Sequence, residues 1–366
     1  MIAELTQING AQKSEVSAPI VLEQIVHQAE SAGASDIHLQ MRGKSAEVAF
    51  RLNGVISEWT ELSVDVAERV FGRIKFLARL KTYQESLPQD GRIAREELKS
   101  QNDVRVATYP TVTGEKIVLR LFNSGAARRL DEISFPDAAS EELEKFLRQT
   151  NGLLLLTGPA GSGKTTTIYA CLRELAQSGG RHIITVEDPV EQIVPGTMQT
   201  GVNEAIGLDF ARAARHVLRQ DPQVLIIGEI RDEATAQLAV RAGLTGHLVI
   251  STLHAGSCRG VFDRLLSMCN DFSAVASAVE LVLNQRLIRC LCSRCNGEGC
   301  NVCAQTGYCG RVPLVEWLRV NDKVREHIRE YELSGLAPAQ TLEASARSLV
   351  NSGVTNEAEF GRVFGL

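Results

Sequence analysis

The segment GPAGSGKT (158–165) constrains this chain most, because it fits the phosphate-binding pattern G-x-x-x-x-G-K-[S/T]. It follows the apolar run LLLLT and precedes TTTIYACLREL, so the sequence predicts a strand, a loop and a helix. Glycines let backbone N–H groups curl around phosphates, and the helix amino terminus adds a favourable dipole. Lys164 would reach the β- and γ-phosphates of a nucleotide, and the Thr165 hydroxyl would ligate Mg²⁺. The expected nucleotide-binding residues are Gly158, Pro159, Ala160, Gly161, Ser162, Gly163, Lys164, Thr165 and Thr166.

A second segment, VLIIGEIRD, supplies the carboxylate that such a loop needs. Its apolar run ends in Gly228-Glu229, as a buried strand does when it delivers an acidic side chain to its carboxyl end. Glu229 would orient or polarise the attacking water, or hold Mg²⁺ through a water. Together the two segments indicate hydrolysis of a nucleoside triphosphate.

Other short apolar runs, separated by helical sequence, predict buried parallel strands in an α/β domain. These runs are HIITV (182–186), VLIIGEI (224–230) and HLVISTL (247–253). The chain before residue 123 contains both apolar residues at helical spacing and the alternation of apolar and polar residues that is typical of strands. Helices are expected at 18–32 and 64–80, and strands within 35–40, 46–59 and 103–122. The fold class is therefore α/β: an α+β domain followed by a phosphate-binding α/β domain.

The length of 366 residues agrees with about two domains. After Cys309 the sequence is expected to be helical to its end. The predicted segments are a flexible N-terminus (1–17), an α+β domain (18–122), a linker (123–137), an ATPase core (138–289), a cysteine-rich motif (290–311) and a C-terminal helical subdomain (312–366).

Charge and hydropathy narrow the function classes further. The formal net charge is −5, which argues against a protein that coats nucleic acid by bulk charge. No run of about 18 apolar residues is present, so no transmembrane helix is expected. The first residues lack the basic and apolar regions of a signal peptide, which favours a cytosolic protein.

Six of the nine cysteines fall between residues 290 and 309, which is typical of metal binding rather than of a disulfide framework. Two C-x-x-C pairs can supply four thiolates to a closed, tetrahedral and therefore structural Zn²⁺ site. Either Cys290 or Cys309 could replace one of these ligands. The predicted zinc ligands are Cys292, Cys295, Cys300 and Cys303.

These motifs belong to a longer series of ordered blocks. The chain resembles the secretion ATPases of type II secretion and type IV pilus assembly, a branch of the ring-forming P-loop motors. The resemblance implies a RecA-like ATPase domain after an N-terminal domain that is PAS-like in the family. The further blocks are SDIHLQ (35–40), FRLNG (50–54), RIKFLARL (73–80), LPQDGR (87–92), RVATYPTVTGEKIVLRL (105–121), TVEDPVE (185–191), LRQDP (218–222), TGHLVISTLHA (245–255) and NQRLIRCLC (284–292).

The resemblance assigns roles to matching positions in the acidic and histidine blocks. Glu187 would be a second catalytic carboxylate, with Asp188 and Glu191 near the metal. His254 would sense the γ-phosphate or contact a neighbouring subunit, and His247 has a weaker claim.

Two arginines in the first domain also match family positions. Arg105 and Arg120 would reach the nucleotide, and they would stabilise developing phosphate charge as arginine fingers do. They act across a subunit boundary if the chain forms the family's ring. Arg92, Arg231 and Arg264 are weaker candidates.

The resemblance further implies ATP with Mg²⁺ and structural Zn²⁺, a homo-hexamer, and a polytopic inner-membrane platform protein as partner. The expected location is cytoplasmic, peripheral at the inner membrane. Only about twenty residues precede the first family helix, so the family's extra N-terminal docking domain is expected to be missing. Docking would then use other surfaces of the chain or a separate cytoplasmic docking protein.

The cysteine pairs favour a motor for pilus or pseudopilus assembly over a pilus retraction motor. Two different functions stay open beside these. One is a nucleic-acid translocase, although the acidic balance of the chain means that no nucleic-acid partner is expected. The second is a scaffold that binds nucleotide without hydrolysing it.

Overall fold

The computed structural model describes residues 17–101, 103–121 and 128–366. Residues 1–16 of the expected flexible N-terminus and residues 123–127 of the expected linker lie outside the described residues. The chain divides into two compact units. One comprises Met1–Gly125 with Cys292–Cys309, and the other comprises Ala126–Leu291 with Gly310–Leu366.

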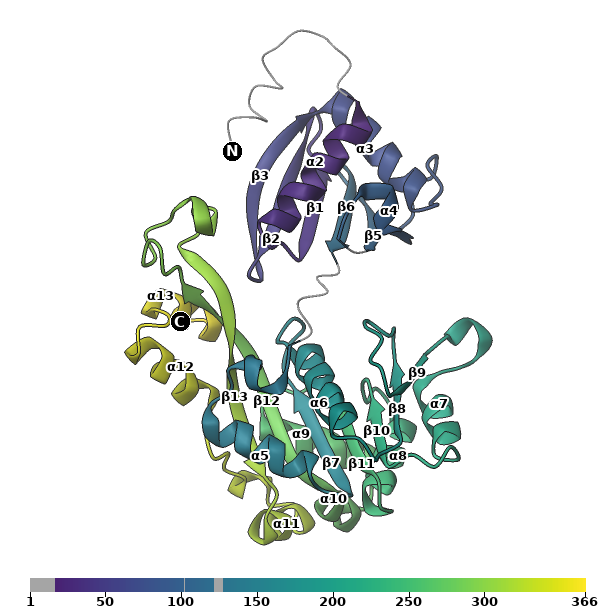
Figure 1. The fold of residues 1–366 in the computed structure, drawn as a ribbon, viewed down its shortest axis with the longest axis vertical. Coiled ribbons are helices and arrows are strands. Elements are labelled where there is room, and N and C mark those ends of the chain that lie inside the picture. The colour runs from purple at the N-terminus through teal and green to yellow at the C-terminus, as the bar shows by residue number, and fades with distance from the viewer. Residues whose placement is uncertain (1–16, 102, 122–127) are drawn as a thin grey trace. The chain divides into compact units, whose positions relative to one another are not determined.

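The N-terminal domain is a six-stranded antiparallel sheet with the order β3-β2-β1-β6-β5-β4 (Figure 1). Helices α2 (Ala18–Ser31) and α3 (Val64–Leu77) cover one face, where their apolar residues pack against alternate residues of the strands. This α+β domain confirms the predicted class. The strands are β1 (Asp36–Met41), β2 (Ser45–Leu52), β3 (Val55–Ser63), β4 (Gln89–Ile93), β5 (Val104–Thr111) and β6 (Gly114–Leu121), and the short helix α4 is Arg95–Leu98.

The second unit contains a seven-stranded sheet with the order β13-β12-β7-β11-β10-β8-β9. Strands β12, β7, β11, β10, β8 and β9 pair in parallel. The predicted apolar runs at 182–186, 224–230 and 247–253 contribute β8, β10 and β11. The strands are β7 (Gly152–Thr157), β8 (Ile183–Glu187), β9 (Met198–Gly201), β10 (Val224–Ile227), β11 (Leu248–Thr252), β12 (Val279–Leu291) and β13 (Tyr308–Arg319).

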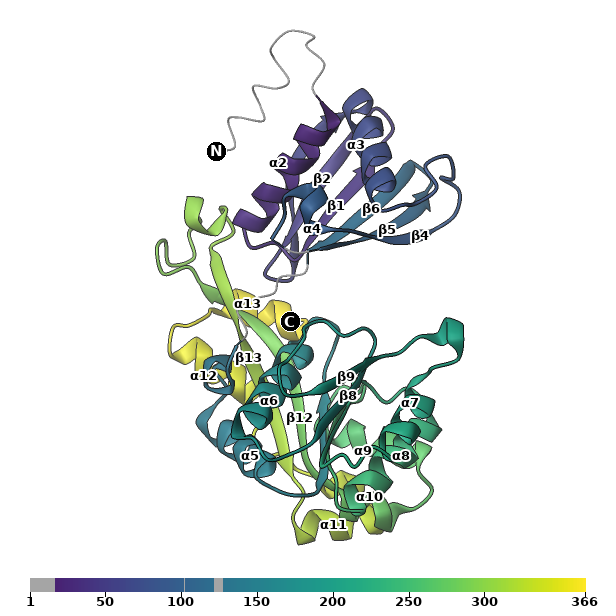
Figure 2. The ribbon, with the colours of Figure 1, turned by 45° about the vertical axis from the view of Figure 1, so that its right-hand side comes forward.

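Helices bury both faces of this sheet. Leu154 and Leu156 of β7 pack with α5 and α6, whereas Leu153 and Leu155 pack with α7 to α10. Figure 2 shows α5 and α6 on one side of the sheet and α8 to α10 on the other. Because both faces are covered, the strands are continuously apolar, as predicted. The helices are α5 (Asp137–Leu147), α6 (Lys164–Ser178), α7 (Phe210–Val217), α8 (Glu233–Leu244), α9 (Cys258–Met268), α10 (Phe272–Ala278), α11 (Asp322–Arg329), α12 (Leu342–Asn351) and α13 (Glu357–Phe364), and the 3₁₀ turns are η1 (Leu130–Ile133), η2 (Glu204–Ile206), η3 (Asn301–Cys303) and η4 (Leu333–Gly335).

The expectation of a helical chain after Cys309 is wrong for its first part. Residues 308–319 form β13, and helix begins only at Asp322. Pro313 lies within β13 and weakens its strand signal, but β13 is an edge strand of the sheet, where proline is tolerated. Strand β12, which precedes the cysteine-rich segment, was also not predicted as a strand.

Among residues 17–101, 103–121 and 128–366, no helix has the length and apolar character needed to cross a membrane.

Candidate functional site

The structure contains the predicted strand, loop and helix. The phosphate-binding loop joins β7 directly to α6. Gly158, Gly161 and Gly163 have φ angles of 131°, 74° and 92°, values that side-chain-bearing residues rarely adopt. A Cβ atom on Gly158 would lie 2.2 Å from the backbone oxygen of Gln285. Both backbone conformation and close approach therefore require glycine in this loop.

Lys164 folds over the loop that precedes it. Its Nζ donates to the backbone oxygens of Gly158 at 2.7 Å and Pro159 at 2.9 Å. Burial lowers the pKa of Lys164, and the negative charge of Glu229 offsets part of that effect. The buried hydroxyl of Ser162 has no hydrogen-bond partner among the described residues. The loop thus presents a cation and an unsatisfied polar group, which suits an anionic ligand.

Strand β12 packs against the phosphate-binding loop through Gln285. Gln285 is almost fully buried, and its Oε1 accepts a hydrogen bond from the Thr167 hydroxyl of α6 at 3.0 Å. A Cβ atom on Gly163 would lie 2.7 Å from Gln285 Nε2. No role was predicted for Gln285, since its only signal in the sequence was its place in the block NQRLIRCLC.

The carboxyl ends of β8, β10 and β11 open into one cavity of about 210 Å³, which Lys164 and Thr165 also line. Strand β8 ends in Glu187, and Glu229 and His254 follow β10 and β11. Parallel strands end at the same edge of a sheet, so three segments far apart in sequence meet here. The structure therefore brings together the predicted phosphate-loop lysine, both predicted carboxylates and the predicted histidine.

The two threonines at the start of α6 differ in position. Thr165 lines the cavity with Glu187, Asp188 and Glu229, whereas Thr166 does not. A hydroxyl with several carboxylates is a donor set of hard oxygens, which Mg²⁺ prefers. The residues at Thr165 thus fit the implied magnesium ion.

Glu229 lies between a histidine and an arginine. His254 Nε2 is 3.3 Å from Glu229 Oε2, and the Arg231 guanidinium donates to Glu229 Oε1. Arg231 also lies 3.4 Å from Asp188 Oδ2, measured from its NH1. Arg231, a weaker candidate from sequence, therefore bridges two acidic side chains at the cavity.

Glu187 is held more tightly than Glu229, and it is 8% exposed. The Tyr169 hydroxyl donates to its Oε2, and the hydroxyl of Thr185 and the amide of Gln199 donate to its Oε1. Both carboxylate oxygens therefore accept hydrogen bonds from the chain itself. This arrangement orients Glu187 and leaves Glu229 as the carboxylate with fewer fixed donors.

The Tyr169 hydroxyl has further partners. It accepts the backbone N–H groups of Glu191 at 3.0 Å and Gln192 at 3.1 Å. Burial, together with the hydrogen bond to Glu187, raises the pKa of Tyr169, so the phenol stays protonated and can donate. Tyr169 was not predicted as a functional residue, because in the sequence it is only one letter of the helix after the loop.

The two arginine candidates lie in the other unit. Arg105 of β5 and Arg120 of β6 are directly opposed in register, so their side chains share a face of the sheet. Arg92 follows on β4 opposite Arg105. The buried Asp36 joins two arginines, with Arg120 Nε at 2.9 Å and Arg51 Nε at 3.3 Å from its oxygens. This row carries four arginines and one aspartate.

Two weaker candidates have backbone partners. His247 precedes β11, at the opposite end of that strand from the cavity, and its Nδ1 lies 3.1 Å from the Ala242 oxygen. Arg264 donates to the backbone oxygen of His254 at 3.1 Å. His247 is therefore separate from the cavity, while Arg264 supports the segment that presents His254.

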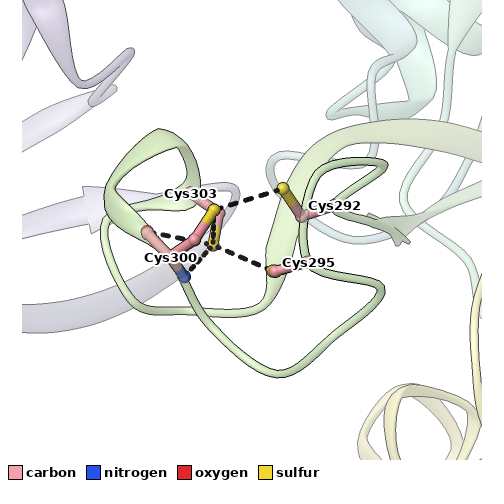
Figure 3. A group of neighbouring side chains, drawn as sticks. All are labelled: Cys292, Cys295, Cys300 and Cys303. Atoms are coloured by element: carbon pink, nitrogen blue, oxygen red, sulfur yellow. Dashed lines mark hydrogen bonds between the residues drawn. The ribbon is translucent and has the colours of Figure 1, made fainter.

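The four predicted zinc ligands meet in the loop between β12 and β13 (Figure 3). Their Sγ atoms lie within 4.8 Å of one another, and three of the separations are 3.8 to 3.9 Å. Four thiolates at about 2.3 Å around one Zn²⁺ would be about 3.8 Å apart. The cluster comprises Cys292, Cys295, Cys300 and Cys303.

Backbone amides surround two of these sulfurs. Gly299 donates to Cys295 Sγ at 3.2 Å, and Cys300 and Gly307 donate to Cys303 Sγ at 3.2 and 3.3 Å. N–H donors of this kind stabilise thiolates, the form that binds metal. Neither Cys290 nor Cys309 belongs to the cluster.

Comparisons with known proteins agree with these features. The family described as "Type II/IV secretion system protein" matches residues 11–362. "Type II secretion system protein E" of Pseudomonas aeruginosa is 37% identical over 98% of this chain and 78% of its own. "Type II secretion system ATPase E" of Vibrio cholerae is 36% identical over 98% of this chain and 78% of its own.

A solved structure of "the Pilus Retraction Motor PilT and Bound ADP" is also similar. It has a TM-score of 0.66 and 26% identity, and the match covers 93% of this chain and 96% of that one. These likenesses confirm the predicted fold class of an N-terminal domain followed by a RecA-like ATPase domain.

Proposed function

Because this chain belongs to the type II/IV secretion system protein family, we propose that it is an ATP-hydrolysing ring motor that powers assembly of a type II secretion pseudopilus or a type IV pilus. One observation carries the proposal. Lys164, Thr165, Glu229 and His254 converge on a single cavity next to a glycine-built phosphate loop. Relatives named as type II secretion proteins, one of them as an ATPase, match nearly the whole chain.

The residues divide the work of hydrolysis. Backbone N–H groups of the loop and the amino end of α6 bind the phosphates, and Lys164 exchanges its two carbonyl partners for phosphate oxygens. Glu229 orients the attacking water and accepts its proton. His254 and Arg231 keep the Glu229 carboxylate aimed into the cavity. Glu187, which Tyr169, Thr185 and Gln199 orient, acts as the second catalytic carboxylate.

Magnesium would be held by the Thr165 hydroxyl, with the carboxylates beside it as direct or water-mediated ligands. When bound, the ion supplies positive charge that neutralises the phosphates.

Arg105 and Arg120 would stabilise the negative charge that develops on the γ-phosphate during hydrolysis. Their shared sheet face supports joint action, and the salt bridge to Asp36 fixes the direction of Arg120. We propose that they act on the nucleotide of a neighbouring chain in a ring of six.

Zinc would bind the four-cysteine cluster and act structurally, because a closed four-thiolate site leaves no position for water. The sulfur separations near 3.8 Å support this assignment.

Membership of the family supports the proposed location and partners. The ring works at the cytoplasmic face of the inner membrane as a peripheral protein, and it contacts a polytopic platform protein and a cytoplasmic docking protein. Turnover shifts the N-terminal domain against the ATPase domain, and that motion drives subunit addition. Nucleic acid is not a partner.

A deletion strain tests the role. Complementation with the wild-type gene should restore secretion or pili, Glu233→Gln should restore them equally, and Glu229→Gln should not. Glu233 lies on the exposed start of α8, outside the cavity. Hyperpiliation of the deletion strain would instead establish a retraction motor. ATPase activity that DNA stimulates would overturn the exclusion of nucleic acid, and native mass spectrometry measures the number of subunits.

A further inference from the structure

We propose that Tyr169 is a positioning residue that couples the phosphate-binding helix α6 to the acidic loop 188–192, and that ATP turnover depends on its hydroxyl through Glu187. The inference rests on the proposed ATPase function and adds a residue to it. None of the roles derived from the sequence involved Tyr169.

The hydroxyl of Tyr169 is fully used. A phenol has one donor and two acceptor positions. Here the donor goes to Glu187, and the acceptors receive the amides of Glu191 and Gln192. One oxygen atom therefore fixes both the carboxylate at the end of β8 and the loop that follows it.

Because Tyr169 lies on α6, its hydrogen bonds connect the phosphate-binding helix to Glu187 and to the acidic loop. The helix begins with Lys164 and Thr165, which line the cavity, and Tyr169 follows about one and a half turns later. A displacement of the loop relative to the helix would break both amide hydrogen bonds, and a displacement of the end of β8 would break the third, to Glu187. Phosphate binding at the start of α6 and the placement of Glu187 are thus mechanically linked.

Arg173 adds a second tie from the same helix. Its guanidinium lies over the Tyr169 ring, 5.8 Å from the ring centroid, and donates to the Gln192 side chain. Arg173 therefore contacts both the Tyr169 ring and the loop, which restricts the orientation of the Tyr169 side chain.

The chain offers a matched control on the other side of Glu187. Thr185 donates to Glu187 Oε1 from within β8 and, like Tyr169, is buried. Thr185→Val removes one donor to Glu187 but leaves the amides of Glu191 and Gln192 bonded. Tyr169→Phe removes a donor to Glu187 and also the oxygen that accepts the amides of Glu191 and Gln192. The two variants therefore separate orientation of the carboxylate from anchoring of the loop.

The first experiment uses the full chain and compares steady-state ATPase kinetics. Tyr169→Phe should lower kcat by about tenfold, the scale expected for a residue that orients a functional group, and change KM for ATP by less than about twofold. Hydrogen exchange should accelerate at Glu191 and Gln192. Thr185→Val should leave exchange at those amides unchanged. An unchanged kcat in Tyr169→Phe would overturn the proposal.

A double-mutant cycle tests the route. If Tyr169 acts through Glu187, Tyr169→Phe should change kcat in a Glu187→Gln background by no more than about twofold, the usual error of additivity. Full additivity of the two effects would show that Tyr169 acts elsewhere and would refute the coupling.

A wild-type measurement covers the case in which Tyr169→Phe does not fold. ADP should slow amide exchange at Glu191 and Gln192, and unchanged exchange on binding ADP would refute the coupling. If the wild-type chain binds ADP with this response but does not hydrolyse ATP, the proposed function fails while the coupling stands.

Discussion

His254 Nε2 lies 3.3 Å from Glu229 Oε2, although the two residues follow different strands of the sheet. Parallel pairing of β10 with β11 brings their carboxyl ends together, and Arg231 contacts the other oxygen of the same carboxylate. These two contacts hold the Glu229 carboxylate at the cavity. Glu187 differs from Glu229 in its partners, because its carboxylate accepts hydrogen bonds from Tyr169, Thr185 and Gln199.

Glu229→Gln should lower kcat for ATP by about 10²- to 10⁴-fold, because the amide cannot accept a proton from water. Binding of a fluorescent ATP analogue should be retained, since Lys164 and the loop are unchanged. Glu233→Gln is the control, and it should keep wild-type kcat. A Glu229→Gln chain with normal turnover would exclude Glu229 as the base.

Arg120→Ala should lower kcat by about 10³-fold, the lower end of the range for an arginine that stabilises phosphate charge. Arg42→Ala is a suitable control, because Arg42 forms an exposed ion pair with Glu47 in the same domain. Such a pair contributes little, about 0 to 1 kcal/mol, to stability. Steady-state kinetics on both variants, with melting temperatures to verify folding, would decide the matter. Equal kcat values for the two variants would remove Arg120 from the mechanism.

Cys295→Ser should reduce bound zinc from about one ion per chain to a small fraction, because a closed four-thiolate site loses one ligand. Elemental analysis of purified protein measures this directly. Cys309→Ser should keep its zinc, since Cys309 is exposed and lies outside the cluster. Loss of zinc in Cys309→Ser and retention in Cys295→Ser would show that the ligand set is different.

Glu359 should make stability depend on pH. Burial alone would raise the pKa of Glu359, but hydrogen bonds from Arg362 and Arg289 outweigh it and hold the pKa below 4.5. A lowered pKa stabilises the fold above the unfolded value and loses that contribution as pH falls through the folded value. Glu359→Gln should therefore flatten the acid side of the plot of unfolding free energy against pH.

The same substitution should cost about 2 kcal/mol near neutral pH, because it removes charged hydrogen bonds that Glu359 accepts from Arg289 of β12 and from Arg362 within α13. Glu357→Gln, in an exposed pair with Arg347, should cost no more than about 0.5 kcal/mol. Denaturant unfolding at several pH values measures both effects. An identical pH profile in wild type and Glu359→Gln would contradict the assignment.

Local signals in the sequence predicted most of the architecture. Apolar runs predicted β7, β8, β10 and β11, and a fixed motif predicted the phosphate loop between β7 and α6. The spacing of the cysteine pairs predicted which four sulfurs meet. In each case the information lies within about twenty consecutive residues, so pattern and chemistry suffice.

The remainder depends on contacts between distant segments. Gln285 reaches Thr167 across 118 positions. Tyr169 and Glu187 are only 18 positions apart, but they lie on a helix and a strand, and no local pattern indicates that their side chains meet. Residues 308–319 were expected to be helical but form strand β13. The strand contains Pro313, which its place at the edge of the sheet makes acceptable. Such outcomes require the tertiary structure.

The position of Gln285 under the phosphate loop makes β12 intolerant of changes in length. Asn284 pairs with Thr157 of β7, and this register sets which residue of β12 meets Gly158. Inserting one residue before Gln285 would turn every later side chain of the strand to the opposite face. Insertions after Leu291 would not disturb that register. Engineered tags or reporter domains should therefore be rejected within β12.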